Sequence, residues 1–188
     1  MNNIAVTGSY ASGKSFVLEC AQSMGYKIFS CDNYIQELYH DINLQKFIES
    51  KIEKLGKFDK KQLARIIYSD SDSREKLESI IHPKVCNGIK SFEQQNAEEK
   101  IIFTEIPLLF ESGFGKYFIY TLCVFCSEDT RIVRAKSRGN INSKFFKEIK
   151  KIQLSQEEKK DRADFTIDSE KNINGIKVAL TEIINSIK

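Results

Sequence analysis

Short apolar runs alternate along the chain with longer segments whose apolar residues recur at helical spacing. The short runs have the length of buried strands, and Gly, Asp or Pro residues follow several of them. The predicted strands are residues 4–7, 27–30, 100–104, 119–125 and 165–167. Pro107 closes the third of these, because proline has no backbone N–H to donate to a strand ladder.

Helices are predicted between these runs. The C-terminal segment shows the clearest pattern, an apolar stripe at spacings of three, four and seven residues that is typical of an amphipathic helix. The stripe consists of Ile173, Ile176, Leu180, Ile183, Ile184 and Ile187. Further helices are predicted at residues 14–24, 129–137 and 144–153, and residues 33–96 are predicted to be almost entirely helical. Breaks in this long segment are expected near Gly56 and between Ser69 and Ser73.

Within residues 33–96, His82 and Pro83 are expected to end a helix, because proline disfavours helical angles in the residue before it. Across the whole chain, strands that alternate with helices indicate an α/β fold with a parallel sheet of about five strands and helices on both faces. No repeat and no Pro- or Gly-rich linker divides the 188 residues, so one domain is expected.

Composition and charge mainly show which partners and locations are not expected. The net charge is +3, from 29 basic and 26 acidic side chains. This imbalance is too small to predict nucleic acid as an obligatory partner. No segment reaches the ~18 apolar residues of a bilayer span, and no basic and apolar leader precedes the first strand. We therefore expect a cytoplasmic protein with no membrane partner and no evident obligatory protein partner.

The five cysteines are expected to be free thiols, since their number is odd and no secretory signal is visible. Cys123 and Cys126 form one CxxC pair inside a predicted buried strand. A zinc site would need two further ligands, and no second pair of this kind exists. Packing is the favoured interpretation, with redox or metal roles left open.

The segment from Gly8 to Ser15, GSYASGKS, matches the phosphate-binding pattern GxxxxGK[ST] in full. It follows a predicted strand and opens a predicted helix, as this loop requires. Its glycines let backbone N–H groups turn toward a phosphate, and the helix dipole favours negative charge there. Lys14 is expected to reach the β- and γ-phosphates, and the Ser15 hydroxyl to ligate Mg²⁺. The loop predicts a nucleoside triphosphate as substrate.

Several classes of protein use a phosphate loop, and the sequence argues against some of them. No Asn-Lys-x-Asp motif for guanine recognition is present, which argues against a GTPase, and the small charge argues against a nucleic-acid machine. A small-molecule kinase remains. Asp32, at the end of the second predicted strand, is a candidate general base for the acceptor hydroxyl. The alternative for Asp32 is a helix N-cap.

Other candidate residues also have plausible structural roles, which for some of them are the favoured ones. Glu105 ends the third strand and is a candidate for binding Mg²⁺ through water. His82 is by itself more typical of a structural residue, and the apolar residues after Pro107 are more typical of core than of a pocket. Three arginines, Arg131, Arg134 and Arg138, lie on a predicted helix that leads into the loop 138–143. They are candidates for neutralising phosphate charge on a closing loop, or form a solvated basic face.

Taken together, these segments resemble the dephospho-coenzyme A kinase family. The resemblance runs in order through the phosphate loop, Asp32, and three further blocks along nearly the whole chain. These blocks are LESIIHP at 77–83, IPLLFE at 106–111, and QLSQEEKKDRAD at 153–164, followed by a strand end at Ile167-Asp168. The phosphate loop alone is widely shared, whereas the three blocks at these separations are specific.

The resemblance implies a P-loop three-layer α/β/α core at about 1–32, 97–137 and 163–188, with a helical acceptor-binding region at about 33–96 and a lid at about 138–153. It implies phosphoryl transfer from ATP to the ribose 3′-hydroxyl of dephospho-CoA, with Asp32 as base and Mg²⁺ on Ser15. The residues implied to bind ATP are Gly8, Ser9, Tyr10, Ala11, Ser12, Gly13, Lys14, Ser15, Arg138 and Arg162. The residues implied to bind the acceptor are Asp32, His82, Leu108, Leu109, Phe110 and Glu111. Lys14 and Arg138 are implied to act with Asp32 in catalysis.

The chain departs from the family pattern in places. Tyr10 is bulkier than the usual loop residue, so its side chain is expected to point away from the phosphates. Gly139 and Ile149 replace an acidic and a basic residue that the family often carries in the lid. Alternatives are another P-loop kinase acting on a nucleoside, nucleotide or small acid, and a non-catalytic ATP-binding module. Few arginines (Arg65 and Arg74) occur in 33–96 to hold a second nucleotide, which disfavours the first alternative.

Overall fold

The structure is a computed structural model that describes residues 1–137 and 152–187. The chain divides into two compact units. The first comprises residues 1–29 and 95–188, and the second comprises residues 30–94. The expected helix at 144–153 and the expected lid at 138–153 lie, apart from their last two residues, outside the described residues.

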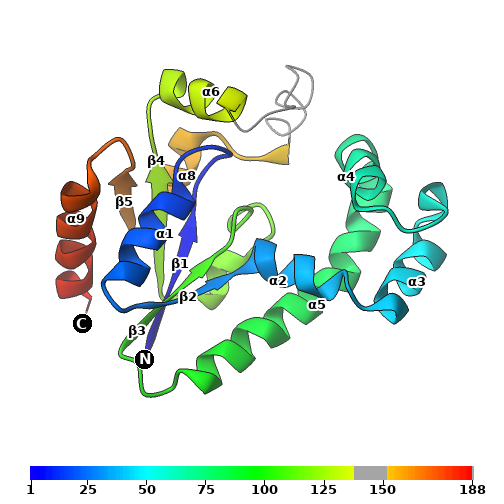
Figure 1. Cartoon of the computed structure of the whole chain (residues 1–188), viewed down its shortest axis with the longest axis horizontal. Helices are drawn as coiled ribbons and strands as arrows, with labels where there is room; N and C mark the ends of the chain where they lie inside the picture. Colours follow the sequence, from blue (N-terminus) through cyan, green and yellow to red (C-terminus); the bar gives the residue numbers. More distant parts are fainter. Residues whose placement is uncertain (138–151, 188) are drawn as a thin grey trace. The chain divides into compact units, whose positions relative to one another are not determined.

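The first unit is built on a five-stranded sheet in the order β2-β3-β1-β4-β5 (Figure 1). Its strands are β1 (Asn2–Thr7), β2 (Lys27–Ser30), β3 (Ile101–Glu105), β4 (Tyr120–Phe125) and β5 (Phe165–Asp168). The pairings of β1 with β3, β1 with β4 and β4 with β5 are parallel. All five strands lie within a few residues of their predicted positions, because each is a short apolar run with a clear break after it.

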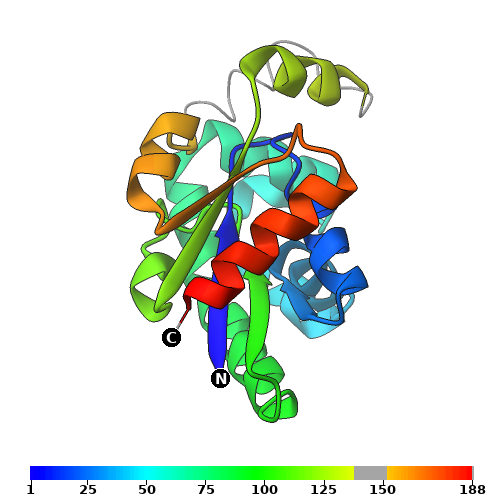
Figure 2. The same ribbon diagram turned by 90° about the vertical axis from the view of Figure 1, so that its left-hand side faces the viewer.

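One face of this sheet forms the main core with two helices, α1 (Lys14–Ser23) and α9 (Ile173–Ser186). Successive side chains of a strand point to opposite faces. On this face, Val6, Leu122 and Ile167 meet Val17 of α1 and Ile176 of α9 in one buried cluster. The apolar stripe of the C-terminal segment is therefore the buried side of α9, which lies along the sheet in Figure 2.

The opposite face carries the alternate side chains, including Thr121 and Cys123 of β4. Helix α8 (Gln156–Arg162) packs against β4. Its fully buried Lys159 lies close enough to the Cys123 thiol to oppose the rise in the pKa of that group. Helices thus cover both faces of a parallel sheet, and the predicted three-layer α/β class is confirmed. The remaining elements of this unit are η2 (Phe114–Tyr117) and α6 (Glu128–Ser137).

The second unit is helical, as predicted for this part of the chain. It consists of α2 (Cys31–Leu38), α3 (Ile42–Lys51), η1 (Glu53–Leu55), α4 (Lys60–Ser69) and α5 (Ser71–Gln95). Gly88 of α5 has no room for a side chain, because a Cβ there would lie 2.6 Å from the ring of Tyr34. A glycine inside a helix has a conformational cost, and here it allows α2 and α5 to approach closely.

The expectation that a helix ends at His82 and Pro83 is wrong. Helix α5 continues through Pro83, which is exposed. Proline removes one backbone hydrogen bond from a helix. The buried residues Leu77, Ile81, Val85 and Ile89 form one continuous apolar stripe on both sides of it. Burial of that stripe outweighs the local cost of the proline.

In the described parts of the chain, no helix is both long and apolar enough to cross a bilayer.

Asp70 gives the second unit a pH-dependent contribution to stability. Its carboxylate accepts hydrogen bonds from Lys54 Nζ at 2.7 Å and from the backbone N–H of Ser73 at 3.1 Å, at the start of α5. These bonds lower the pKa of Asp70 from 3.8 to about 2. A carboxyl group whose pKa falls on folding stabilises the folded state above its unfolded pKa. This contribution is lost as the pH falls through the interval from about 4 to about 2.

We predict that Asp70→Asn loses less stability than the wild type between pH 5 and pH 3. Asparagine caps a helix as well as aspartate but has no carboxyl group to protonate in this range. Urea midpoints of both proteins at the two pH values measure the difference. Identical shifts in the two proteins would contradict the assignment.

Candidate nucleotide-binding site

The predicted phosphate loop connects β1 to α1, and two of its glycines are required by close contacts. A Cβ on Gly8 would lie 2.3 Å from the carbonyl oxygen of Val124. A Cβ on Gly13 would lie 2.5 Å from Ser169 Oγ, and Gly13 also has a φ of 94°, which favours glycine. The loop therefore turns tightly against the ends of β4 and β5, directly before the start of α1.

Among the described residues, the interior of this loop contains two buried hydroxyl groups without a hydrogen-bond partner. Ser9 Oγ and Ser12 Oγ are buried and make no hydrogen bond in the described structure. Buried hydroxyl groups normally have a partner, so such atoms need an explanation. Lys14 Nζ donates to the carbonyl oxygens of Gly8 at 2.9 Å and Ser9 at 3.3 Å. Its ammonium thus lies over the loop, where a phosphate would add acceptors.

Arg134 of α6 supports the loop from outside. Its guanidinium donates to Ser169 Oγ at 2.7 Å, to the Ser169 carbonyl at 3.1 Å and to the Ser12 carbonyl at 3.4 Å. Ser169 Oγ itself donates to the Ser12 carbonyl at 2.6 Å. A loop built of small residues is therefore fixed by a buried serine and an arginine, and Arg134 is not part of a fully solvated basic face.

Gln153 contacts the tip of the loop: the backbone N–H of Tyr10 donates to Gln153 Oε1 at 3.0 Å. Beside this contact lies a cavity of about 790 Å³, lined mainly by residues 125–131 and 153–160 together with Tyr10 and Glu170. Glu170 accepts hydrogen bonds from Thr130 and Ser127, and these lower the pKa of its carboxyl. The cavity thus has polar walls and is open next to the loop.

The turn after β3 holds the residues that the resemblance assigns to the acceptor. Leu109 is fully buried, so its packing accounts for its apolar character, while Leu108 and Phe110 are half-buried. Glu111 pairs with Lys159 at 2.9 Å and accepts from the N–H of Leu154 at 2.9 Å. Their proposed contacts with the acceptor stay a prediction.

Asp32 and His82 belong to the second unit. Asp32 is exposed in the first turn of α2 and is not its N-cap, because the Ser30 side chain accepts from the N–H of Asn33 at 3.4 Å. The alternative interpretation of Asp32 as a cap is therefore wrong. His82 is half-buried in the middle of α5.

Two of the candidate residues bear on Mg²⁺. Ser15 is exposed in the first turn of α1, beside Lys14. Glu105 ends β3 and pairs in register with Val6, two residues before the loop begins. Hydroxyl and carboxylate oxygens suit Mg²⁺, which retains several water ligands when it binds with nucleotide phosphates. The donor set therefore fits the ion, although the described residues form no cluster of three or more His, Cys, Asp or Glu side chains around a metal position.

The cysteines are all free, as expected, and four of the five are buried. Burial raises the pKa of Cys123 to about 11 and also raises the pKa of Cys126. The reactive form of cysteine is the thiolate, so these groups are poor nucleophiles and poor metal ligands near neutral pH. The packing interpretation of the CxxC pair is favoured by this result.

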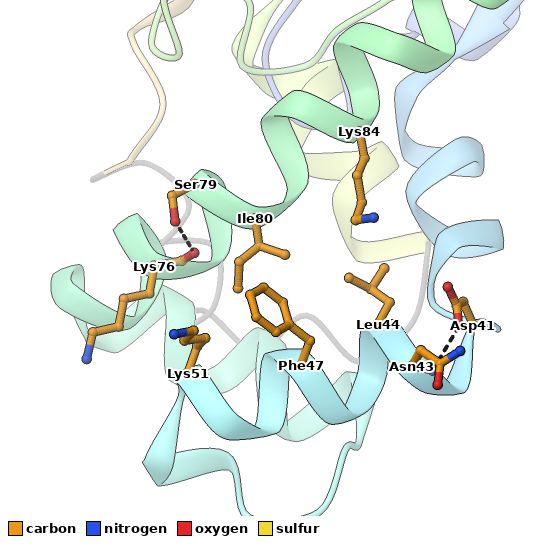
Figure 3. Close-up of a pocket in the computed structure, with 9 residues that line it drawn as sticks. All are labelled: Asp41, Asn43, Leu44, Phe47, Lys51, Lys76, Ser79, Ile80 and Lys84. Carbon is orange, nitrogen blue, oxygen red and sulfur yellow. Dashed lines mark hydrogen bonds between the residues drawn. The ribbon is translucent and has the colours of Figure 1, made fainter.

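The second unit has a cavity of its own, of about 510 Å³, between α3 and α5 (Figure 3). Leu44, Phe47 and Ile80 form its apolar part. Lys51, Lys76 and Lys84 also line the cavity, and Lys51 Nζ lies 5.5 Å from the centre of the Phe47 ring. The cavity therefore combines an apolar base with a positively charged rim.

Two arginines of the predicted ATP site are not placed at the loop. Arg138 lies outside the described residues, as do Gly139 and Ile149. Arg162 is exposed in the last turn of α8, shortly before β5. Their roles with ATP stay predictions.

Three residues around the loop were not among the candidate residues: Gln153, Lys159 and Ser169. Arg134 was a candidate for neutralising phosphate charge, not for holding the loop. The sequence indicated a possible role for Arg134, because this residue lies on the predicted helix that carries three arginines. Nothing in the sequence indicated Lys159 or Ser169. Both lie in charged or polar segments, where residue spacing does not show which side chain is buried and which are exposed.

Comparison with known proteins gives one consistent result. The family model described as dephospho-CoA kinase matches residues 2–175. A protein of Rickettsia typhi named dephospho-CoA kinase is 39% identical over 98% of this chain and 97% of its own length. A protein of the same name from Fusobacterium nucleatum is 34% identical over 92% of both.

Solved structures agree with this result. The protein TT1252 of Thermus thermophilus has a TM-score of 0.80 at 27% identity, over 100% of this chain and 98% of its own. Dephospho-CoA kinase from Campylobacter jejuni has a TM-score of 0.66 at 27% identity, over 99% and 96%. Shikimate kinase from Acinetobacter baumannii, at 12% identity and a TM-score of 0.55 over 100% and 96%, shares the fold alone.

Proposed function

The chain belongs to the dephospho-CoA kinase family, and from that membership we propose which of its residues carry out the reaction. The activity is the ATP-dependent phosphorylation of dephospho-CoA, which gives coenzyme A and ADP. The observation that carries the assignment of the site is the loop between β1 and α1, with its buried, unpartnered Ser9 and Ser12 hydroxyl groups and the Lys14 ammonium above it.

ATP binds with its β- and γ-phosphates inside residues 8–15. The backbone N–H groups and the N-terminus of α1 donate to the phosphates, and Lys14 neutralises the charge on the γ-phosphoryl group. Arg134 and Ser169 keep the loop in this shape through Ser12. Arg138 is proposed to approach the phosphates from the lid, and Arg162 is proposed to lie beside ATP.

Mg²⁺ is proposed to bind at Ser15, with Glu105 holding one of its water ligands. When bound, the ion offsets charge on the β- and γ-phosphates. The protein's own contribution is positional: Ser15 sits in the first turn of a helix and Glu105 at the end of a strand. Both oxygens are thus carried by regular elements.

Asp32 is proposed as the general base. Its carboxylate accepts the proton of the ribose 3′-hydroxyl as the oxygen of that group bonds to the γ-phosphorus. The bond from the γ-phosphorus to the bridging oxygen of ADP breaks in the same step, and ADP leaves. Ser30, and not Asp32, caps α2, so the capping role does not fall to the Asp32 carboxylate. His82 and the turn at 108–111 are proposed to hold the acceptor.

The cavity of the second unit is proposed to take the diphosphate and pantetheine part of the acceptor. Dephospho-CoA joins an anionic diphosphate to a long arm of lower polarity. The lysine rim and the apolar base formed by Leu44, Phe47 and Ile80 complement these two parts. In Figure 3 the Lys84 side chain extends toward Leu44, so its ammonium is close to the base of the cavity.

We predict that Lys84→Glu raises the KM for dephospho-CoA by about tenfold, because a charge-assisted contact contributes about 1.5–3 kcal/mol. The KM for ATP should stay within twofold. Lys46→Glu is the matched control, since it makes the same charge change at an exposed position of α3 outside the cavity lining. Equal KM values for dephospho-CoA in the two variants would remove the cavity from the acceptor site.

The function is tested by comparing acceptors. ADP release is followed with dephospho-CoA, shikimate or deoxyadenosine as acceptor, in the presence of ATP and Mg²⁺ and after addition of a chelator. The proposal expects release that is fastest with dephospho-CoA by orders of magnitude and that stops with the chelator. Faster release with another acceptor would contradict it. A cytoplasmic location and independence of an obligatory protein partner stay predictions of the sequence.

A further inference from the structure

Lys159 is fully buried, which is rare for a lysine unless its charge is paired. It lies on α8, and its ammonium group reaches three oxygen atoms. These are the carbonyl oxygen of Pro107 at 2.6 Å, Glu111 Oε1 at 2.9 Å and Thr7 Oγ1 at 3.5 Å. An ammonium group has three donors, so these partners account for all of them.

The partners of Lys159 come from separate segments of the first unit. Thr7 is the last residue of β1 and directly precedes Gly8 of the phosphate loop. Pro107 and Glu111 belong to the turn after β3. Glu111 Oε1 also accepts from the N–H of Leu154, just before α8. The Thr7 hydroxyl donates to the Pro107 carbonyl at 3.2 Å, which closes the network.

The network lies beside the phosphate loop. Burial raises the pKa of the Cys123 thiol, and the positive charges of Lys159 and Lys14 both act to lower it. Both ammonium groups are therefore within electrostatic reach of one buried atom. Lys159 thus contacts the residue directly before the loop, and also the turn that the proposed function assigns to the acceptor.

Stability alone is a weak explanation for such a pair. Removing two charges from water is costly, and well-packed apolar residues in their place are often as stable or more stable. The second carboxylate oxygen of Glu111 is also buried without a partner in the described structure, which adds to this cost. A pair that links the loop and the turn has a positional consequence that an apolar pair would lack.

We propose that Lys159, paired with Glu111, is a positioning residue for phosphoryl transfer, which fixes the turn at 107–111 against Thr7 at the entrance of the phosphate loop. The inference rests on the proposed function. Because reacting groups must meet in one geometry, a displacement of about 1 Å can lower a rate by ~10²-fold. Loss of the network should therefore lower kcat more than it lowers nucleotide affinity.

The test separates position from stability with the double variant Lys159→Met/Glu111→Leu. Lys159→Met alone leaves the Glu111 carboxylate buried and unpaired, so its melting temperature should fall. The double variant removes both charges and should regain a melting temperature close to that of the wild type. We expect its kcat for dephospho-CoA to remain about 10- to 100-fold below the wild type. Its affinity for ADP, measured by calorimetry without acceptor, should stay within threefold.

The matched control is Lys54→Met/Asp70→Asn, which removes an ion pair of similar length away from both cavities and keeps a capping side chain at residue 70. Lys54 and Asp70 are 2.7 Å apart in the second unit, and Lys54 is exposed to solvent. We expect kcat in this control to equal that of the wild type within twofold. Lys159→Arg, which keeps a cation beside Glu111, should recover a substantial part of kcat.

A double variant with a wild-type melting temperature and a kcat within twofold of the wild type would overturn the proposal, since Lys159 would then only stabilise the fold. If that variant does not fold, Lys159→Met/Glu111→Gln keeps an acceptor for the N–H of Leu154, and the same criterion applies to it. Failure of the proposed function is seen separately, as a wild-type protein that binds ADP but forms no coenzyme A.

Discussion

Lys14→Ala is expected to lower kcat/KM for phosphorylation of dephospho-CoA by about 10³-fold, through the loss of charge stabilisation on the γ-phosphoryl group. The Lys14 ammonium lies over the loop, held by the carbonyl oxygens of Gly8 and Ser9. It is therefore preorganised at the position where negative charge develops. Electrostatic groups of this kind are usually the largest single contribution to catalysis. Steady-state kinetics with ADP release as the readout measure the change.

The control for this variant is Lys27→Ala, which removes an exposed lysine from the start of β2. It should retain wild-type kinetics and the same melting temperature. Lys14→Ala should also remain folded, because its side chain is only partly buried. A folded Lys14→Ala protein with kcat/KM within tenfold of the wild type would exclude the loop as the site of phosphoryl transfer.

Asp32→Asn is expected to lower kcat by about 10²- to 10⁴-fold, the usual contribution of general base catalysis. The amide has nearly the same shape as the carboxylate but cannot accept the proton of the 3′-hydroxyl. Affinity for ATP should be unchanged, since the phosphate loop is untouched. Ser30 still caps α2, so the helix should keep its stability. Single-turnover measurements with bound ATP isolate the chemical step.

Asp59→Asn is the control for Asp32→Asn, because Asp59 caps α4 in the same unit through its bond to the N–H of Gln62. It makes the same chemical change at a position with a structural role. Its turnover should match that of the wild type. Wild-type turnover in Asp32→Asn would show that Asp32 is not the general base and is only a surface residue of α2.

The strands could be predicted from sequence because each is a short apolar run ended by a residue that breaks it. The C-terminal helix could be predicted for the same kind of reason, since Ile176 and Leu180 recur on one face and are both buried. At Pro83 the local preference of proline predicted the end of a helix, and that prediction was wrong. Its effect on the backbone is local, whereas burial of Leu77, Ile81, Val85 and Ile89 depends on the packed unit.

The site was predictable where a backbone motif carries the chemistry. Residues 8–15 form the loop that their spacing predicts, and Gly13 is required there by both its φ and its contact with Ser169. Supporting residues were not predictable. Lys159 and Lys160 are neighbours in one charged segment, yet the first is fully buried and the second only half-buried. Distant segments decide that difference, because Thr7, Pro107 and Glu111 supply the partners of Lys159.

The proposed reaction is tested most directly by the structure of the product that the purified protein forms from ATP, Mg²⁺ and dephospho-CoA. Mass spectrometry detects the added phosphate, and ³¹P NMR locates it on the ribose. We expect coenzyme A with a 3′-phosphate, formed in equal amount with ADP and absent with Lys14→Ala. ATP binding without coenzyme A, or a phosphate at another position, would contradict it.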